Sequence, residues 1–119
     1  MTQEFDGSPP TAEPPTEFDV YEFVLLRRAP NPPLIDEGAA ELLQRQHLGH
    51  LSAMRDVGHL KVAGPFSDQP DESWRGLCLY QVGSLKEARR FAEADPAVRA
   101  GRFTVDVMHW YTRKGAVKF

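Results

Sequence analysis

The side chains of this 119-residue chain that can move protons or attack a substrate include four histidines and a single cysteine. His47 is the most informative of them, because Leu43 and Leu51 stand four residues before and after it. In a helix these three residues share one face, which turns the imidazole toward an apolar core. Such a histidine is either a structural residue bonded to a backbone carbonyl or a general base in a pocket. Periodicity alone leaves both interpretations open.

Asp95 lies in the segment EADPAVRAGRF, residues 93–103, directly before Pro96. Asp followed by Pro favours the start of a helical turn, because the carboxylate caps unpaired amides and proline suits the first helical position. The same carboxylate could accept a hydrogen bond from a histidine ring, fix its tautomer and make it a better base. The two roles are compatible, so the sequence predicts a cap and leaves the second role open.

The other candidates are less informative. His47 and His50 are one helical turn apart, but no third ligand follows at a convincing spacing, so we expect no metal site. Cys78 stands in an apolar run with no basic residue at a fixed spacing, and we expect a buried, unreactive thiol there. His59 has no pattern around it, and His109 is expected within a strand. We also expect no cofactor.

Six predicted elements must position these residues. Runs of β-branched and aromatic residues indicate strands, and an apolar period of three to four residues between capping residues indicates helices. In chain order we predict a strand at 20–28, a helix at 36–57, strands at 59–66 and 74–82, a helix at 85–94 and a strand at 102–112. The order β-α-β-β-α-β predicts an α+β, ferredoxin-like fold with a four-stranded antiparallel sheet.

One face of that sheet is expected to have no cover from the chain itself, since right-handed crossovers place both helices on the other side. The strand at 20–28 alternates Val24 and Leu26 with Phe23 and Leu25, so both of its faces are apolar. A face exposed to water would carry polar residues instead. A second copy of the chain would bury the uncovered face, and we therefore expect a homodimer.

Composition limits the possible partners and compartments. The net charge is −3 and no basic cluster is interleaved with aromatic residues, so we expect no nucleic-acid partner. We expect no membrane partner, because no apolar run is long enough to span a bilayer and no signal sequence is evident. A single cysteine favours the cytoplasm. Residues 1–17 are rich in proline and poor in apolar side chains, which predicts a disordered tail before one domain at 18–119.

Three segments carry a resemblance to a known family: HLGHLSAMRDVGHLKVAGPF (47–66), EADPAVRAGRF (93–103) and VDVMHWY (105–111). In this order they resemble the YCII-related family of small bacterial proteins over residues 19–113, and the GPF element is similar to the DGPF-type relatives. The resemblance implies a dimeric ferredoxin-like α+β barrel with a His–Asp acid/base dyad, which falls on His47 and Asp95. One branch of the family removes chloride from a chlorinated hydroxyhydroquinone, and related folds include lactone isomerases and cofactor-free oxygenases.

Two functional hypotheses are compatible with these observations. In the first, the protein is a cofactor-independent lyase or isomerase, for example of the dehydrochlorinase type, that acts on a small compound in a pocket. His47 is then the base, Asp95 orients it, and the backbone of Gly64 and Pro65 shapes the pocket wall, where glycine permits close approach of a ligand. In the second, the protein is a non-catalytic dimeric module that binds a metabolite or a partner protein. An enzyme needs His47 in a pocket and close to Asp95, whereas a binding module needs only the pocket.

Overall fold

The computed structural model describes residues 17–119, so the predicted tail at 1–17 lies outside the described residues except for Glu17. The elements are β1 (Phe18–Arg28), α1 (Glu37–Asp56), β2 (Leu60–Pro65), β3 (Trp74–Tyr80), α2 (Leu85–Glu93), α3 (Pro96–Arg99) and β4 (Phe103–Arg113). The strands form one antiparallel sheet in the order β2-β3-β1-β4. The predicted ferredoxin-like arrangement is therefore confirmed, with α3 as a single additional turn before β4.

The sequence at both ends of α1 explains where this 20-residue helix begins and ends. Asp36 caps its first turn, because the carboxylate accepts a hydrogen bond from Ala39 N at 2.7 Å. After Val57 the chain turns at Gly58, whose φ of 84° is a conformation that favours glycine. His47 is the only buried residue of α1. Within residues 17–119 no helix is both long and apolar enough to cross a membrane.

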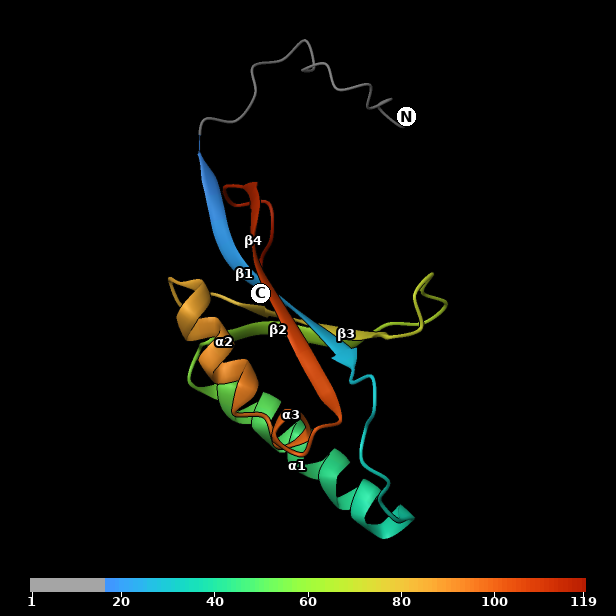
Figure 1. Ribbon diagram of the computed structural model, residues 1–119. Helices are drawn as coiled ribbons and strands as arrows, with labels where there is room; N and C mark the ends of the chain where they lie inside the picture. Colours follow the sequence, from blue (N-terminus) through green and yellow to red (C-terminus); the bar gives the residue numbers. More distant parts are fainter. Residues whose placement is uncertain (1–16) are drawn as a thin grey trace.

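The hydrophobic core lies between one face of the sheet and the three helices, which gather on the same side (Figure 1). Val24, Leu60 and Tyr80 are among the strand residues buried there. Helix α2 contributes Ala88 and Ala92, whose small side chains let the helix approach the sheet closely. Helices α1 and α3 contribute partly buried side chains to the same cluster. This packing holds α1 and the connection between α2 and α3 over one face of the sheet.

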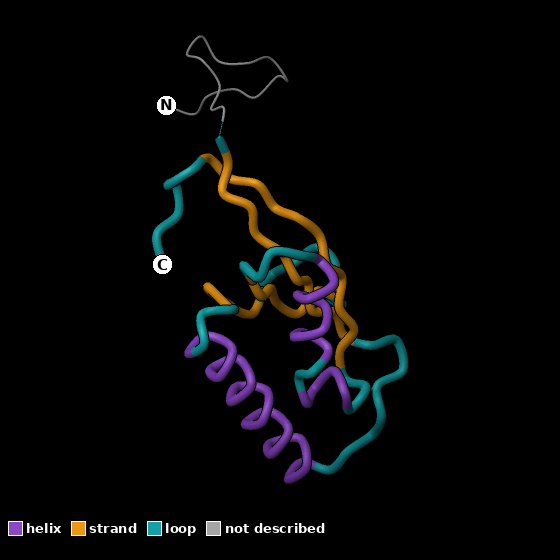
Figure 2. Tube along the Cα trace, turned by 90° about the vertical axis from the view of Figure 1, so that its left-hand side faces the viewer, coloured by secondary structure: helices purple, strands orange, loops and turns teal. Residues whose placement is uncertain are grey.

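Strands β1 and β4 extend beyond the rest of the sheet as a two-stranded ribbon (Figure 2). They pair along their whole length, whereas β3 pairs with β1 only from Glu22 to Arg27. The C-terminal residues fold back on this ribbon, so that the ring of Phe119 packs edge-on against Tyr21 with 5.7 Å between centroids. Tyr21 is consequently buried, and the chain itself covers a part of the face that the sequence predicts to be uncovered.

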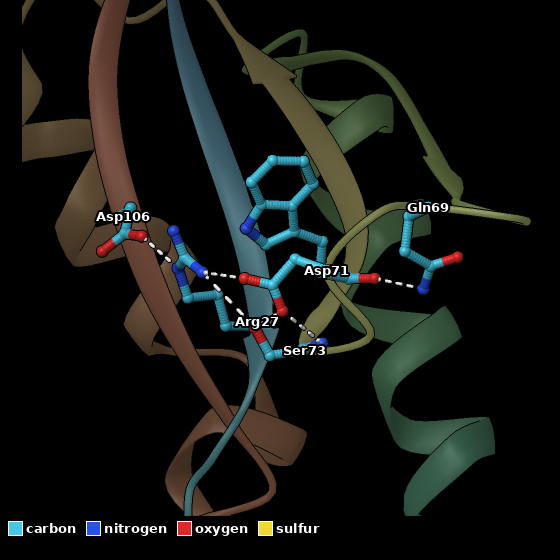
Figure 3. A network of polar contacts seen from close by, with 6 residues as sticks. Arg27, Gln69, Asp71, Ser73 and Asp106 are labelled. Atoms are coloured by element: carbon cyan, nitrogen blue, oxygen red, sulfur yellow. Dashed lines mark hydrogen bonds and ion pairs between the residues drawn. The ribbon is translucent and has the colours of Figure 1, made fainter.

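The rest of that face, which we call the open face, combines apolar side chains with a polar network. Arg27 donates to Asp106 on β4 and also forms an ion pair with Asp71 in the β2–β3 connection (Figure 3). Nearby on β4, Met108 and Trp110 remain 43% and 40% exposed. The open face is thus apolar over part of its area, but the homodimer itself stays a prediction.

Candidate active site

His47 projects from the middle of α1 toward the sheet, as the spacing of Leu43 and Leu51 predicts. Its side chain is only 11% exposed. The imidazole is held from two sides: Phe103 packs edge-on against the ring at 5.8 Å, and ring nitrogen Nδ1 lies 2.6 Å from Asp95 Oδ2. A buried histidine needs a hydrogen-bonding partner for its ring nitrogens, and here the partner is a carboxylate and not a backbone carbonyl.

Asp95 combines the two roles that its sequence context leaves open. One carboxylate oxygen, Oδ1, accepts a hydrogen bond from Ala97 N at 2.9 Å and caps α3, with Pro96 in the first turn. The other oxygen, Oδ2, faces His47. Asp95 is only 2% exposed, so water does not replace either contact. The cap therefore fixes the carboxylate rigidly, and the rigid carboxylate in turn fixes the imidazole.

The pairing determines which nitrogen of His47 is available to a ligand. An ionised carboxylate can only accept hydrogen bonds, so Nδ1 carries a proton and donates it to Asp95 Oδ2. In the neutral ring the second nitrogen, Nε2, is then unprotonated. It has no hydrogen-bond partner among residues 17–119. A histidine that a carboxylate orients in this way can act as a general base.

A cavity of about 320 Å³ lies between α1 and the sheet, with His47 in its wall. Gly64 and Pro65, the residues that the sequence analysis assigned to a pocket wall, line the same cavity. A methyl group added at Gly64 would meet no atom within 4 Å. The structure thus brings all four sequence-predicted site residues to one place, with Asp95 buried behind His47. Their action on a substrate stays a prediction.

Cys78 also lines this cavity, and its environment makes the thiol unreactive. Burial raises the pKa of Cys78 to about 12, and the negative charge of Asp95 contributes to the increase. Burial likewise raises the pKa of the neighbouring Tyr80 well above its ordinary value. At neutral pH both groups keep their protons, which leaves His47 as the candidate proton acceptor in the cavity wall.

The other histidines have partners of their own. His50 Nε2 lies 2.9 Å from the carbonyl oxygen of Phe91, and the ring of His59 stacks on Phe91 at 4.4 Å. His109 is an exposed residue of β4, in agreement with its predicted place in a strand. His47 and His50 are turned to different partners and do not converge. Over the described range 17–119, no group of three or more His, Cys, Asp and Glu residues is arranged to hold a metal ion.

Sequence reasoning missed Gly76, Phe103 and Gln44 as residues of the site. Gly76 is needed because the backbone of β2 approaches it closely: a Cβ at this position would lie 2.7 Å from the carbonyl oxygen of Gly64. A glycine within a predicted strand was the signal that could have revealed this contact. Phe103 and Gln44 line the cavity together with His47, and no local pattern distinguishes them.

The sequence of the chain matches a known protein family. The family model of the YCII-related domain matches residues 23–111, a range that contains His47, Asp95 and the whole cavity wall. No curated protein matches the chain. Among solved structures the chain is similar to 5-chloro-2-hydroxyhydroquinone dehydrochlorinase from Burkholderia phenoliruptrix AC1100, in complex with 2,5-dihydroxybenzoquinone, with 21% identity, a TM-score of 0.48 and coverage of 75% of this chain and 92% of that one.

Proposed function

Because the chain belongs to the YCII-related domain family, we propose that it is a small-molecule enzyme of the lyase or isomerase kind, with His47 and Asp95 as its acid/base dyad. The observation that carries the proposal is the 2.6 Å contact between His47 Nδ1 and Asp95 Oδ2 beside a cavity of about 320 Å³. A cavity of that size suits a small ring compound. The apolar side chains of Leu26, Leu51 and Phe103 in its wall strengthen electrostatic interactions by excluding water.

In the proposed mechanism, His47 Nε2 removes a proton from the substrate. The ring becomes a cation, and the Asp95 carboxylate balances its charge across the 2.6 Å contact. The electron pair left on the substrate has two possible fates. In an isomerisation the ring returns the proton to a different atom of the substrate. In an elimination the electron pair forms a double bond, a leaving group such as chloride departs with its bonding electrons, and the ring later releases the proton to water.

A panel of small lactones and chlorinated hydroquinones in D₂O would test this proposal. We expect NMR to detect deuterium exchange, rearrangement or chloride release for at least one compound. His47→Gln should slow that reaction by about 10² to 10⁴-fold, the usual contribution of a general base. His50→Gln is the matched control, because His50 is on the same helix, lies outside the cavity and bonds to Phe91 O. Its rate should stay close to that of the wild type.

Two results would count against the proposal. If His47→Gln and the wild type convert a compound at the same rate, His47 is not the base. If compounds bind in the cavity and none of the panel exchanges or reacts, the non-catalytic binding module is the better description of the protein.

We further propose that the protein works as a homodimer that buries the open face of the sheet. The support is the apolar surface that Met108 and Trp110 leave exposed there, at 43% and 40%. An exposed aromatic and a thioether on one sheet face are typical of surfaces that pack against a partner. The polar network around Arg27 would lie at the same interface and fix the orientation of the two copies.

A further inference from the structure

A second cavity, of about 280 Å³, adjoins the one that contains His47. The two cavities share three lining residues, Gln44, Arg75 and Phe103. We call the second one the arginine cavity, because the guanidinium-bearing residues Arg28, Arg75 and Arg102 all line it. A ligand that fills both cavities would place one end at His47 and the other end among the arginines.

The arginine cavity is a local concentration of positive charge on an acidic protein. The chain carries a net charge of −3, yet no aspartate or glutamate of the described range 17–119 lines either cavity. Within residues 17–119, Arg28, Arg75 and Arg102 form no ion pair with a carboxylate. Unpaired guanidinium groups that converge on a concave surface favour an anionic ligand.

The contrast between two neighbouring residues illustrates this arrangement. Arg27 points to the open face, where Asp106 and Asp71 neutralise it (Figure 3). Arg28, the next residue along β1, lines the arginine cavity on the helix side and forms no such pair. The sheet thus separates Arg27, which is paired, from Arg28, which has no carboxylate partner among residues 17–119 and lines the arginine cavity.

Backbone features place the other two arginines. A β-bulge in the pairing of β1 with β3 leaves Trp74 opposite Arg27, with Arg75 as the extra residue that lines both cavities. Arg102 donates from its guanidinium to the carbonyl oxygen of Pro33 at 2.9 Å. Ala29 N in turn donates to Arg102 O at 2.9 Å. Both contacts tie the loop after β1 to the start of β4, so Arg102 is held in place before any ligand binds.

We propose that the arginine cavity binds an oxyanion group of the substrate, a carboxylate or a phosphate, while the body of the same molecule lies against His47. This inference rests on the proposed function and narrows its substrate class to small organic acids or phosphoesters. The planar guanidinium group matches both oxyanions in geometry, and binding of the anion orients the reactive part of the molecule toward Nε2. Arg75 lines both cavities and therefore links recognition to the reacting centre.

Benzoate and benzamide are suitable probes, because they have the same shape and differ in charge. In NMR titrations of the full chain, we expect benzoate to bind at least about 10-fold more tightly than benzamide, as expected for charge-assisted hydrogen bonds. Benzoate should shift the Nε–H signals of the three arginines, and its affinity should fall as salt is added. Competition with inorganic phosphate distinguishes the two oxyanions. If phosphate binds more tightly than benzoate and displaces it, the substrate group is a phosphate. If benzoate binds more tightly than phosphate, the substrate group is a carboxylate.

Substitutions test whether the arginine cavity is the place where benzoate binds. Arg75→Gln should weaken benzoate binding at least about 10-fold and leave benzamide binding unchanged, because only the charged contact is lost. Arg45→Gln is the matched control, since Arg45 is an exposed residue of α1 that lines neither cavity. Equal affinity for benzoate and benzamide, binding of neither probe, or an equal loss in Arg45→Gln and Arg75→Gln would overturn the inference.

The same experiments separate this inference from the proposed function. His47→Gln should slow turnover of the compound panel by about 10² to 10⁴-fold and leave the preference for benzoate over benzamide intact. If the protein prefers benzoate and turns over no compound, the proposed enzymatic function is refuted and the proposed anion site is supported. If it turns over a compound and shows no preference for benzoate, the proposed anion site is refuted and the enzymatic function is supported.

Discussion

Replacement of Asp95 separates its two contacts, because the carboxylate both caps α3 and holds His47. Asp95→Ala removes the hydrogen bond to Ala97 N, and loss of such a cap costs about 1 kcal/mol. It also leaves the N–H of His47 Nδ1 buried without its acceptor, which costs about 1 to 3 kcal/mol more. We therefore expect the free energy of unfolding to fall by about 2 to 4 kcal/mol.

Asp36→Ala is the matched control for this substitution. Asp36 caps α1 through a 2.7 Å hydrogen bond to Ala39 N, is exposed and has no histidine partner. Its loss should cost only about 1 kcal/mol. Asp95→Asn keeps an oxygen for the cap and presents its amide group to the ring, so it should cost less than Asp95→Ala.

Urea unfolding at one fixed protein concentration measures all three free energies, and the fixed concentration keeps any contribution from association constant. If Asp95→Ala costs no more than Asp36→Ala, the contact with His47 contributes nothing to stability. Asp95 would then be a cap only, and the main support for the dyad would be lost.

Three further predictions concern the cavity wall and the assembly. Gly76→Ala should destabilise the protein by about 1 to 3 kcal/mol in urea unfolding, because its Cβ would lie 2.7 Å from Gly64 O. Gly64→Ala should leave stability nearly unchanged. Equal stabilities of the two variants would show that β2 and β3 can separate at position 76 at no cost. Cys78, with its pKa raised to about 12, should resist a thiol reagent at pH 8 in the folded protein and react in denaturant. In the unfolded chain the Cys78 thiol has its ordinary pKa of 9.0, so unfolding above about pH 9 releases the thiol proton, and the free energy of unfolding should fall between pH 9 and pH 12. Rapid labelling of Cys78 in the folded protein would contradict its burial. Sedimentation at micromolar concentration should give the mass of a dimer, and a folded monomer would remove the argument from the open face.

Local patterns in the sequence were sufficient to predict the fold and the orientation of the catalytic candidates. The apolar residues around His47 predicted that its ring faces the sheet, and Asp–Pro predicted the cap at Asp95, since both are consequences of helix geometry and backbone hydrogen bonding. That the two residues meet could not be derived from periodicity. They are 48 positions apart, and only the packing of α1 against the connection between α2 and α3 brings them together.

Features that depend on long-range contacts were not predictable. Strict alternation along β3 misplaces Arg75, because a bulge adds a residue whose position is set by the partner strand. Phe119 covers Tyr21 only because the C-terminal residues turn back on the ribbon of β1 and β4, and neither residue carries a local signal for that contact. The arginine cavity combines residues of three strands, two helices and the connections between them, so charge counting along the chain does not reveal it.

The tautomer of His47 tests the central claim most directly, because a general base needs an unprotonated Nε2 facing the substrate. Nitrogen-15 NMR of the ring, assigned with His47→Gln, reports which nitrogen carries the proton at a pH where the ring is neutral. We expect the proton on Nδ1 in the wild type, donated to Asp95 Oδ2 at 2.6 Å, and on Nε2 in Asp95→Asn, where the amide group becomes the donor. A wild-type ring with its proton on Nε2, or a tautomer that Asp95→Asn leaves unchanged, would contradict the account.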